Sequence, residues 1–140
     1  MERCLLDTDI LSYYFKGNEN VVSNFNNYLN HFDSSNISII TYYEIVSGLK
    51  AKNANKQLNV FNEFCELNNI LPLTESSAHI SAELYAKLKN QGTIVDDIDL
   101  LIAGIAIDNE FDLVTNNTKH FSRIPDLKIQ NWSNSFRYKK

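Results

Sequence analysis

Acidic side chains in three well-separated segments are the residues of this chain best suited to chemistry. Each follows a short apolar run or lies near the start of a helical pattern, and two asparagines follow a further run; the set is Asp7, Asp9, Glu44, Asp96, Asp97, Asp99, Asn116 and Asn117. Carboxylate and amide oxygens select Mg²⁺ or Mn²⁺ when no Cys or His takes part. Such an ion polarises phosphoryl oxygens and generates hydroxide near neutral pH. If these segments meet, they indicate metal-assisted hydrolysis of a phosphate ester.

Helix caps and turns could each use one of these residues instead. The cap candidates are Thr8 or Asp9 for one helix, a "TYYE" capping box at 41–44 for a second, and Asp96 or Asp99 for a third. Asn116 and Asn117 are common turn residues. A cap needs only one oxygen at each helix start, whereas carboxylates gathered from several segments repel one another unless a cation neutralises them. Their joint occurrence therefore favours a shared metal site.

Short apolar runs that alternate with helical patterns predict the elements that must position these acids. The expected strands are "CLL" at 4–6, "ISII" at 37–40, "ILPL" at 70–73, "LVT" at 113–115 and "LKI" at 127–129. Apolar residues at three- and four-residue intervals predict helices over 11–15, 21–32, 42–49, 57–67, 78–91 and 99–110. Alternation of this kind predicts parallel strands and an α/β fold, a helix–sheet–helix sandwich. Ligands then bind at the carboxyl ends of the strands, where these acids fall.

The segment 99–110 is expected to be the central helix because it is apolar on nearly all sides. Its small residues Ala103, Gly104 and Ala106 would allow a close approach to the sheet.

Composition limits the class of protein. The chain has 140 residues, 44% of them hydrophobic, which suits one domain with one core. No apolar run is long enough to cross a bilayer and no signal-peptide pattern opens the chain, so we expect a cytoplasmic protein. The net charge of −4 argues against coating nucleic acid by charge alone, and the basic clusters at 49–56 and 136–140 are interpreted as solvated faces. Cys4 and Cys65 are expected to be free thiols.

Four segments of the chain resemble, in order, the signature segments of PIN domains, and most closely those of VapC-type toxins of bacterial toxin–antitoxin pairs. They are "LLDTDILSYYFKG", "ISIITYYEIVSGL", "GTIVDDIDLLIAGIA" and "LVTNNTKHFSRIPDLKIQNW". The resemblance covers nearly the whole chain. It implies a single PIN domain over 1–140 with a central parallel sheet of four to five strands. It also implies a Mg²⁺- or Mn²⁺-dependent endoribonuclease that cuts structured RNA, commonly tRNA, a cognate VapB-like antitoxin, and a homodimer.

The resemblance also implies a set of catalytic and metal-binding residues: Asp7, Glu44, Asp99 and Asn117. The last of these is often Asp in the family, so the chain carries one charge fewer, and one or two ions could bind. Asp96 is interpreted as a helix cap and Asp97 as solvent-facing. Lys119, His120 and Arg123 could meet phosphate oxygens. Aromatic residues at helical spacing could stack on bases, although a core or partner-facing role is commoner; they are Tyr13, Tyr14, Phe15, Tyr42 and Tyr43. The first helical segments, 10–15 and 21–32, are candidates for contacts with the antitoxin or a second copy, and a plain core role fits them equally well.

Two other functions remain possible from the residues. The "LLDTDIL" segment resembles the D-x-D motif of haloacid-dehalogenase-type phosphatases, although Leu11 stands where Thr is expected. The second alternative is a PIN-like module that binds RNA or a protein without cutting, and Asn117 is the residue that favours it.

Overall fold

A parallel five-stranded sheet forms the centre of the protein in the computed structural model, which describes residues 1–134. Its strands are β1 (Cys4–Leu6), β2 (Asn36–Ser38), β3 (Asn69–Leu71), β4 (Asp112–Val114) and β5 (Ile129–Gln130). They lie in the order β3-β2-β1-β4-β5, and every neighbouring pair is parallel. The predicted α/β class and strand number are therefore confirmed.

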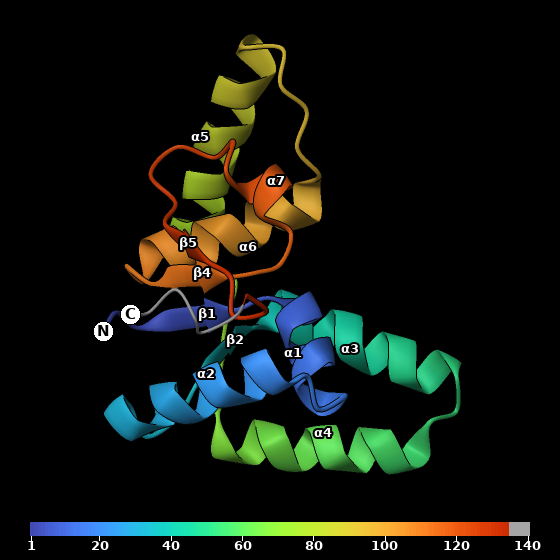
Figure 1. Cartoon of the computed structure of the whole chain (residues 1–140). Coiled ribbons are helices and arrows are strands. Elements are labelled where there is room, and N and C mark those ends of the chain that lie inside the picture. Colours follow the sequence, from blue (N-terminus) through green and yellow to red (C-terminus); the bar gives the residue numbers. More distant parts are fainter. Residues whose placement is uncertain (135–140) are drawn as a thin grey trace.

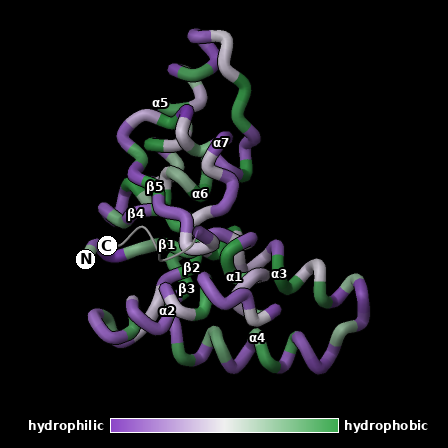
Figure 2. Tube along the Cα trace, in the orientation of Figure 1, coloured by the Kyte–Doolittle hydropathy of each residue, from purple (hydrophilic) through white to green (hydrophobic). Residues whose placement is uncertain are grey.

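Helices cover both faces of this sheet (Figure 1). They are α1 (Thr8–Phe15), α2 (Glu19–His31), α3 (Ile39–Ala51), α4 (Asn55–Leu67), α5 (Glu75–Asn90), α6 (Asp97–Asp108) and the short α7 (Thr118–Phe121). Helices α5 and α6 lie on one side of the sheet, and α1, α2 and α4 lie on the other. In Figure 2 the outer helices α2 and α4 alternate between hydrophilic and hydrophobic residues, as helices with one buried face do.

The central strand β1 is buried on both faces of the sheet, which explains why its three residues are all apolar. In β1, Cys4 and Leu6 point into the core on the α1 and α2 side, whereas Leu5 points into the core beneath α6. All three side chains are at most 1% exposed. A parallel strand buried on both faces reads as a continuous apolar run. The three-residue prediction at 4–6 was therefore sufficient to place this strand.

Aromatic side chains fill the core on the α1 and α2 side. Tyr14, Phe25 and Phe64 contact one another, and Trp132 packs on Phe25 with ring centroids 6.3 Å apart. The core interpretation of the first two helices is thus confirmed for Tyr14 of α1 and Phe25 of α2. Phe15 keeps part of its ring exposed.

Helix α6 packs closely against α5 at Gly104. A Cβ atom at this glycine would overlap the Ser81 Oγ atom and lie 2.6 Å from the Ser77 carbonyl oxygen, both on α5. Ser81 also donates a hydrogen bond of 2.7 Å to the Leu100 carbonyl oxygen. We expected Gly104 to allow a close approach of this helix to the sheet. That expectation was wrong, because the element that approaches Gly104 closely is helix α5.

Three local predictions near helix starts were wrong. Ile39 and Ile40 belong to α3 and not to a strand. Ser38 caps that helix, because its hydroxyl accepts a hydrogen bond of 3.0 Å from the backbone amide of Thr41. The proposed capping box at 41–44 is therefore absent. Helix α1 is capped by Asp7, and not by Thr8 or Asp9.

Several expectations outside the sheet can also be compared with the structure. Across residues 1–134, no helix combines the length and apolar character needed to cross a membrane. Cys4 is a buried free thiol and Cys65 is a half-buried one. The basic segment 136–140 lies outside the described residues.

Candidate active site

The adjacent strands β1 and β4 end at the same edge of the sheet, and Asp7 lies where β1 ends. The Asp7 amide donates to the Val114 carbonyl oxygen of β4 at 2.9 Å, which continues the strand pairing. Its carboxylate accepts two hydrogen bonds of 2.8 Å, one from the Thr8 amide and one from the Thr115 hydroxyl. The Asp7 side chain is therefore held in one orientation at the centre of the edge.

Burial of Asp7 makes its negative charge unfavourable. Asp7 is only 8% exposed. Desolvation, with the nearby charge of Asp9 and a smaller contribution from Asp99, raises the pKa of Asp7 to about 7. The two hydrogen bonds act in the opposite direction but do not offset burial. A cation beside this carboxylate would restore its charged form, which is the behaviour of a metal ligand.

Glu44 reaches the same edge from α3. Its Oε1 atom accepts a hydrogen bond of 2.6 Å from the Thr8 hydroxyl, which also lies 3.1 Å from the Thr41 hydroxyl. Thr8 follows Asp7 directly, so one short segment holds the first predicted acid and contacts the second.

Asp99 and Asn117 meet through His120 of α7. The Asp99 Oδ2 atom lies 4.0 Å from the His120 Nδ1 atom, and the Asn117 Nδ2 atom lies 3.1 Å from the same nitrogen. The backbone amide of Asn117 also donates a hydrogen bond of 2.9 Å to the Thr115 hydroxyl. Burial, followed by the charge of Asp96, raises the pKa of Asp99, and the neighbouring imidazole opposes that rise.

A continuous series of contacts therefore joins all four predicted site residues. It runs in the order Glu44, Thr8, Asp7, Thr115, Asn117, His120 and Asp99. The charges act on one another as well, because Asp99 raises the pKa of Asp7 and Glu44 raises that of Asp99. Convergence of the four residues at one sheet edge is thus a property of the fold.

The donor set suits a hard cation, although the acids are not tightly grouped. Within residues 1–134, no three His, Cys, Asp or Glu side chains lie close enough together to hold a metal ion by themselves. An ion at this edge would need oxygens from Asn117, from threonine or from water in addition to carboxylates. Magnesium usually keeps several waters and uses few carboxylates, so the residues fit it. The metal site itself stays a prediction.

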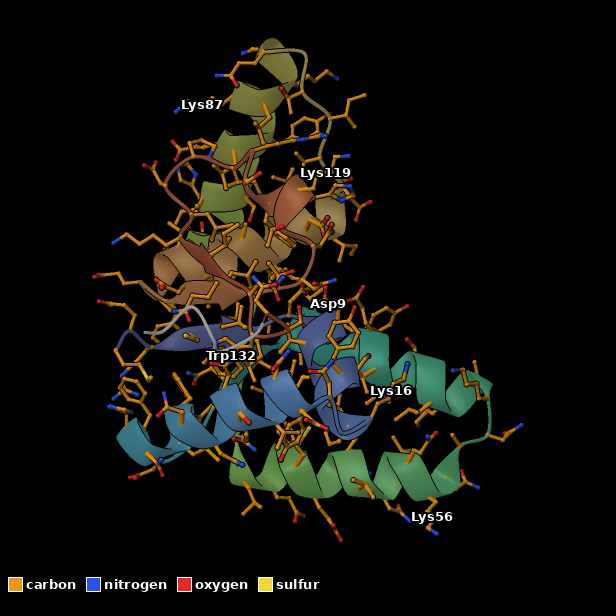
Figure 3. All side chains as sticks on the ribbon, in the orientation of Figure 1. Asp9, Lys16, Lys56, Lys87, Lys119 and Trp132 are labelled. Atoms are coloured by element: carbon orange, nitrogen blue, oxygen red, sulfur yellow. The ribbon has the colours of Figure 1, made fainter. Side chains whose placement is uncertain are left out.

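Asp9 is a neighbour of the site, although the four site residues implied by the family resemblance do not include it. Its Oδ2 atom accepts a hydrogen bond of 3.1 Å from the Asn116 amide. Its Oδ1 atom is buried and has no hydrogen-bond partner among the described residues, and burial raises the pKa of Asp9. Figure 3 shows Asp9 near the start of α1. The second acid of the Asp-Thr-Asp segment was the signal that could have identified it.

Asn116 connects the loop between β4 and α7 to other parts of the chain. Its side-chain amide donates to the Tyr13 hydroxyl at 3.2 Å. Its Oδ1 atom accepts from the Asn131 amide at 3.0 Å and from the Ser133 hydroxyl at 2.9 Å. The loop that carries Asn117 is therefore braced by α1 and by the segment after β5.

The other two acids of the α6 start have the roles that were predicted. Asp96 is the N-cap of α6 and accepts the Ile98 amide at 3.2 Å, and Asp97 is exposed. Asp99 does not cap the helix, since its carboxylate lies toward His120. One helix start thus provides a cap and a site residue from different acids.

The basic residues beyond the site differ in their roles. Arg123 donates a hydrogen bond of 3.3 Å to the Ile94 carbonyl oxygen, so it tethers the loop between α5 and α6. Lys119 is exposed, and Figure 3 labels it on α7. Lys119 is therefore the better placed of the two to meet a phosphate. Tyr43, 68% exposed on α3, is the most accessible of the aromatic candidates for base stacking.

Fold and site together define a class of protein, in which a parallel sheet between two helical layers carries an oxygen-rich acidic site at its carboxyl edge. The family model of the PIN domain matches residues 4–127. The chain therefore belongs to the PIN-domain family of nucleases, which confirms the resemblance. The phosphatase alternative was wrong.

Relatives of known name cover almost the whole chain. Ribonuclease VapC1 of Methanocaldococcus jannaschii is 34% identical over 128 residues, which span 91% of this chain and 85% of that protein. The tRNA(fMet)-specific endonuclease VapC of Shigella flexneri is 31% identical over 135 residues, spanning 95% of this chain and 100% of that protein. The chain is thus similar to VapC nucleases along its full fold.

Solved structures give the same result. DNA-bound VapBC from Salmonella typhimurium matches with a TM-score of 0.84 at 30% sequence identity, over 94% of this chain and 99% of that chain. VapBC2 from Rickettsia felis, bound to a DNA fragment from its promoter, matches with a TM-score of 0.83 at 30% identity, over 92% of this chain and 98% of that chain.

Proposed function

We propose that this protein is a VapC-like toxin, an endoribonuclease that depends on Mg²⁺ or Mn²⁺ and cuts structured RNA. The observation that carries the proposal is the series of contacts that brings Asp7, Glu44, Asp99 and Asn117 to one sheet edge. Side chains so far apart in the chain have no local reason to meet, and the raised pKa of buried Asp7 is unfavourable without a positive partner.

Each residue has a distinct part in this proposal. Asp7, Asp99 and Asn117 would hold the ion directly or through water, and Glu44 would complete the shell or orient the attacking water. When bound, the ion would polarise the phosphoryl oxygen and lower the pKa of a bound water. The Thr8 and Thr115 hydroxyls keep the carboxylates in place through hydrogen bonds of 2.6 and 2.8 Å. Lys119, exposed on α7, would receive a neighbouring phosphate of the RNA.

The proposed substrate and partners follow from the relatives. The relative from Shigella flexneri is named as a tRNA(fMet)-specific endonuclease, so tRNA is the substrate that we propose. A matching structure from Klebsiella pneumoniae is a toxin–antitoxin complex, with a TM-score of 0.70 at 25% identity. We therefore include a VapB-like antitoxin in the proposal. The homodimer and the cytoplasmic site of action are included as expectations from the sequence alone.

Cleavage of RNA by matched variants tests the catalytic claim. Purified parent protein should cut a tRNA pool in the presence of Mg²⁺ and should stop when a chelator is added. Asp7→Asn and Asp99→Asn should abolish cleavage and restore growth to cells that express the protein. Asp97→Asn, which changes an exposed acid at the same helix start, is the control and should cut like the parent. Equal toxicity of the parent and of both site variants would refute the proposal.

A binding module that does not cut is the second candidate. It is favoured by Asn117 and by the finding that, in residues 1–134, no three His, Cys, Asp or Glu side chains form a group that could hold a metal ion. It predicts that Asp7→Asn and Asp99→Asn bind RNA as the parent does, with no cleavage by any of the three proteins. The same assay therefore separates the two functions.

A further inference from the structure

His120 lies between two residues of the site that come from different elements. Its Nδ1 atom is 3.1 Å from the Asn117 Nδ2 atom and 4.0 Å from the Asp99 Oδ2 atom. The first distance is a hydrogen bond and the second is too long for one. The closer partner of the imidazole is thus the amide of Asn117, and the carboxylate of Asp99 stays available.

An amide differs from a carboxylate in a way that makes this contact important. The two oxygens of an aspartate are equivalent, so either can face a cation. An asparagine has one acceptor end and one donor end, and only its Oδ1 atom can bind Mg²⁺ or Mn²⁺. If the Asn117 side chain turned by half a rotation about its last bond, it would present an NH₂ group to the ion. Some neighbour must therefore fix which end of Asn117 faces the site.

The imidazole of His120 meets this need in one tautomer. With the proton on Nε2, the Nδ1 atom has a lone pair that accepts a hydrogen bond from the Asn117 Nδ2 group. That bond directs Oδ1 away from the ring, and no hydrogen bond within residues 1–134 occupies Oδ1. The main chain holds the pair in register, because the His120 amide donates to the Asn117 carbonyl oxygen at 3.2 Å.

We propose that His120 is a positioning residue, which orients the Asn117 side chain so that its Oδ1 atom faces the cation of the site. This inference rests on the metal dependence proposed above. His120 acts through Asn117 and needs no contact with the RNA. Asn117 stands where the family often has an aspartate, and His120 thus enables it to act as a metal ligand.

Calorimetric titration of the full chain with Mn²⁺ tests this role without any measurement of cleavage. Groups that orient a metal ligand typically change the affinity about 10- to 100-fold, so His120→Ala should weaken Mn²⁺ binding by about tenfold or more. His120→Asn places a carbonyl oxygen near the position of Nδ1 and should recover most of the affinity. His31→Ala, which removes an exposed imidazole in the last turn of α2, is the control and should bind like the parent.

A double-mutant cycle then separates positioning from a direct effect on Asp99. In the background of Asn117→Ala, which has no amide to orient, His120→Ala should cause no further loss of affinity. A full additional loss there would overturn the inference, because the imidazole would then act on Asp99. Equal Mn²⁺ affinities of His120→Ala and the parent would also overturn it. Thermal melting of the metal-free variants verifies that each is folded.

The outcomes distinguish this inference from the proposed function. A parent that binds no Mn²⁺ would refute the metal dependence and the positioning role together. A parent that binds Mn²⁺ and loses nothing in His120→Ala refutes the positioning role alone. If His120→Asn binds Mn²⁺ as tightly as the parent but cannot cleave, the imidazole also contacts the substrate, and the claim that His120 acts only through Asn117 is wrong.

Discussion

Replacing Asp7 with asparagine should stabilise the metal-free protein near neutral pH. The carboxyl group of Asp7 ionises near 3.8 in an unfolded chain and at about 7 in the fold. Between these values the folded state binds the proton more tightly, so the free energy of unfolding falls as the pH rises. The stability linked to this proton is fully present below about pH 4, and it is lost as the pH rises from about 4 to about 7.

The size of this effect follows from the same two values. The difference between 3.8 and about 7 corresponds to about 4 kcal/mol, since each pKa unit is worth about 1.4 kcal/mol. Screening by solvent removes little of it, because Asp7 is 8% exposed. Asparagine keeps one acceptor where the carboxylate has two, and the weakened hydrogen bond costs about 1 kcal/mol. Asp7→Asn should therefore be more stable than the parent by about 3 kcal/mol near pH 7 and no more stable near pH 4.

Urea unfolding in the presence of a chelator measures this difference over the pH range from about 4 to about 7.5. The curve of the parent should descend through this range, and that of Asp7→Asn should be flatter. Asp97→Asn, in which the acid removed is exposed, serves as the control and should run parallel to the parent. Parallel curves for Asp7→Asn and the parent would refute the conclusion that burial penalises this charge. Added Mg²⁺ should raise the stability of the parent near pH 7, by about 2.7 kcal/mol at a hundredfold excess over its dissociation constant.

Three further substitutions test other contacts. Gly104→Ala should destabilise the fold by about 1–3 kcal/mol in urea unfolding, because its Cβ atom would overlap Ser81; a stability equal to that of the parent would contradict the close packing of α5 on α6. Asn116→Ala should lower stability by about 1 kcal/mol and reduce RNA cleavage, since the braces of the loop that carries Asn117 are lost. Glu44→Gln keeps an oxygen that can accept the Thr8 hydroxyl, so the melting temperature should not change, whereas cleavage should fall about tenfold or more. Unchanged cleavage by this last variant would exclude the charge of Glu44 from the reaction.

Local patterns predicted the elements best where burial is complete. The run at 4–6 is a strand in the structure because both faces of β1 are covered. The run at 37–40 was misassigned because its apolar character continues past the strand, and the Ser38 cap decides where α3 begins. Helix α7 was not predicted, since four residues are too few to show a helical period.

Residue types and their order were sufficient to predict the parallel fold and the position of the candidate oxygen donors at the carboxyl ends of the strands. Periodicity and strand alternation are properties of neighbouring residues, so a single chain displays them. The partners of those donors were not predictable in this way: Thr115 beside Asp7, Thr8 beside Glu44, and the α5 helix against Gly104. These contacts depend on which helices and strands pack together and on the rotamers that packing allows. The orientation and burial of the acids therefore arise only in the assembled core, where removal from water gives Asp7 a pKa that no isolated segment would have.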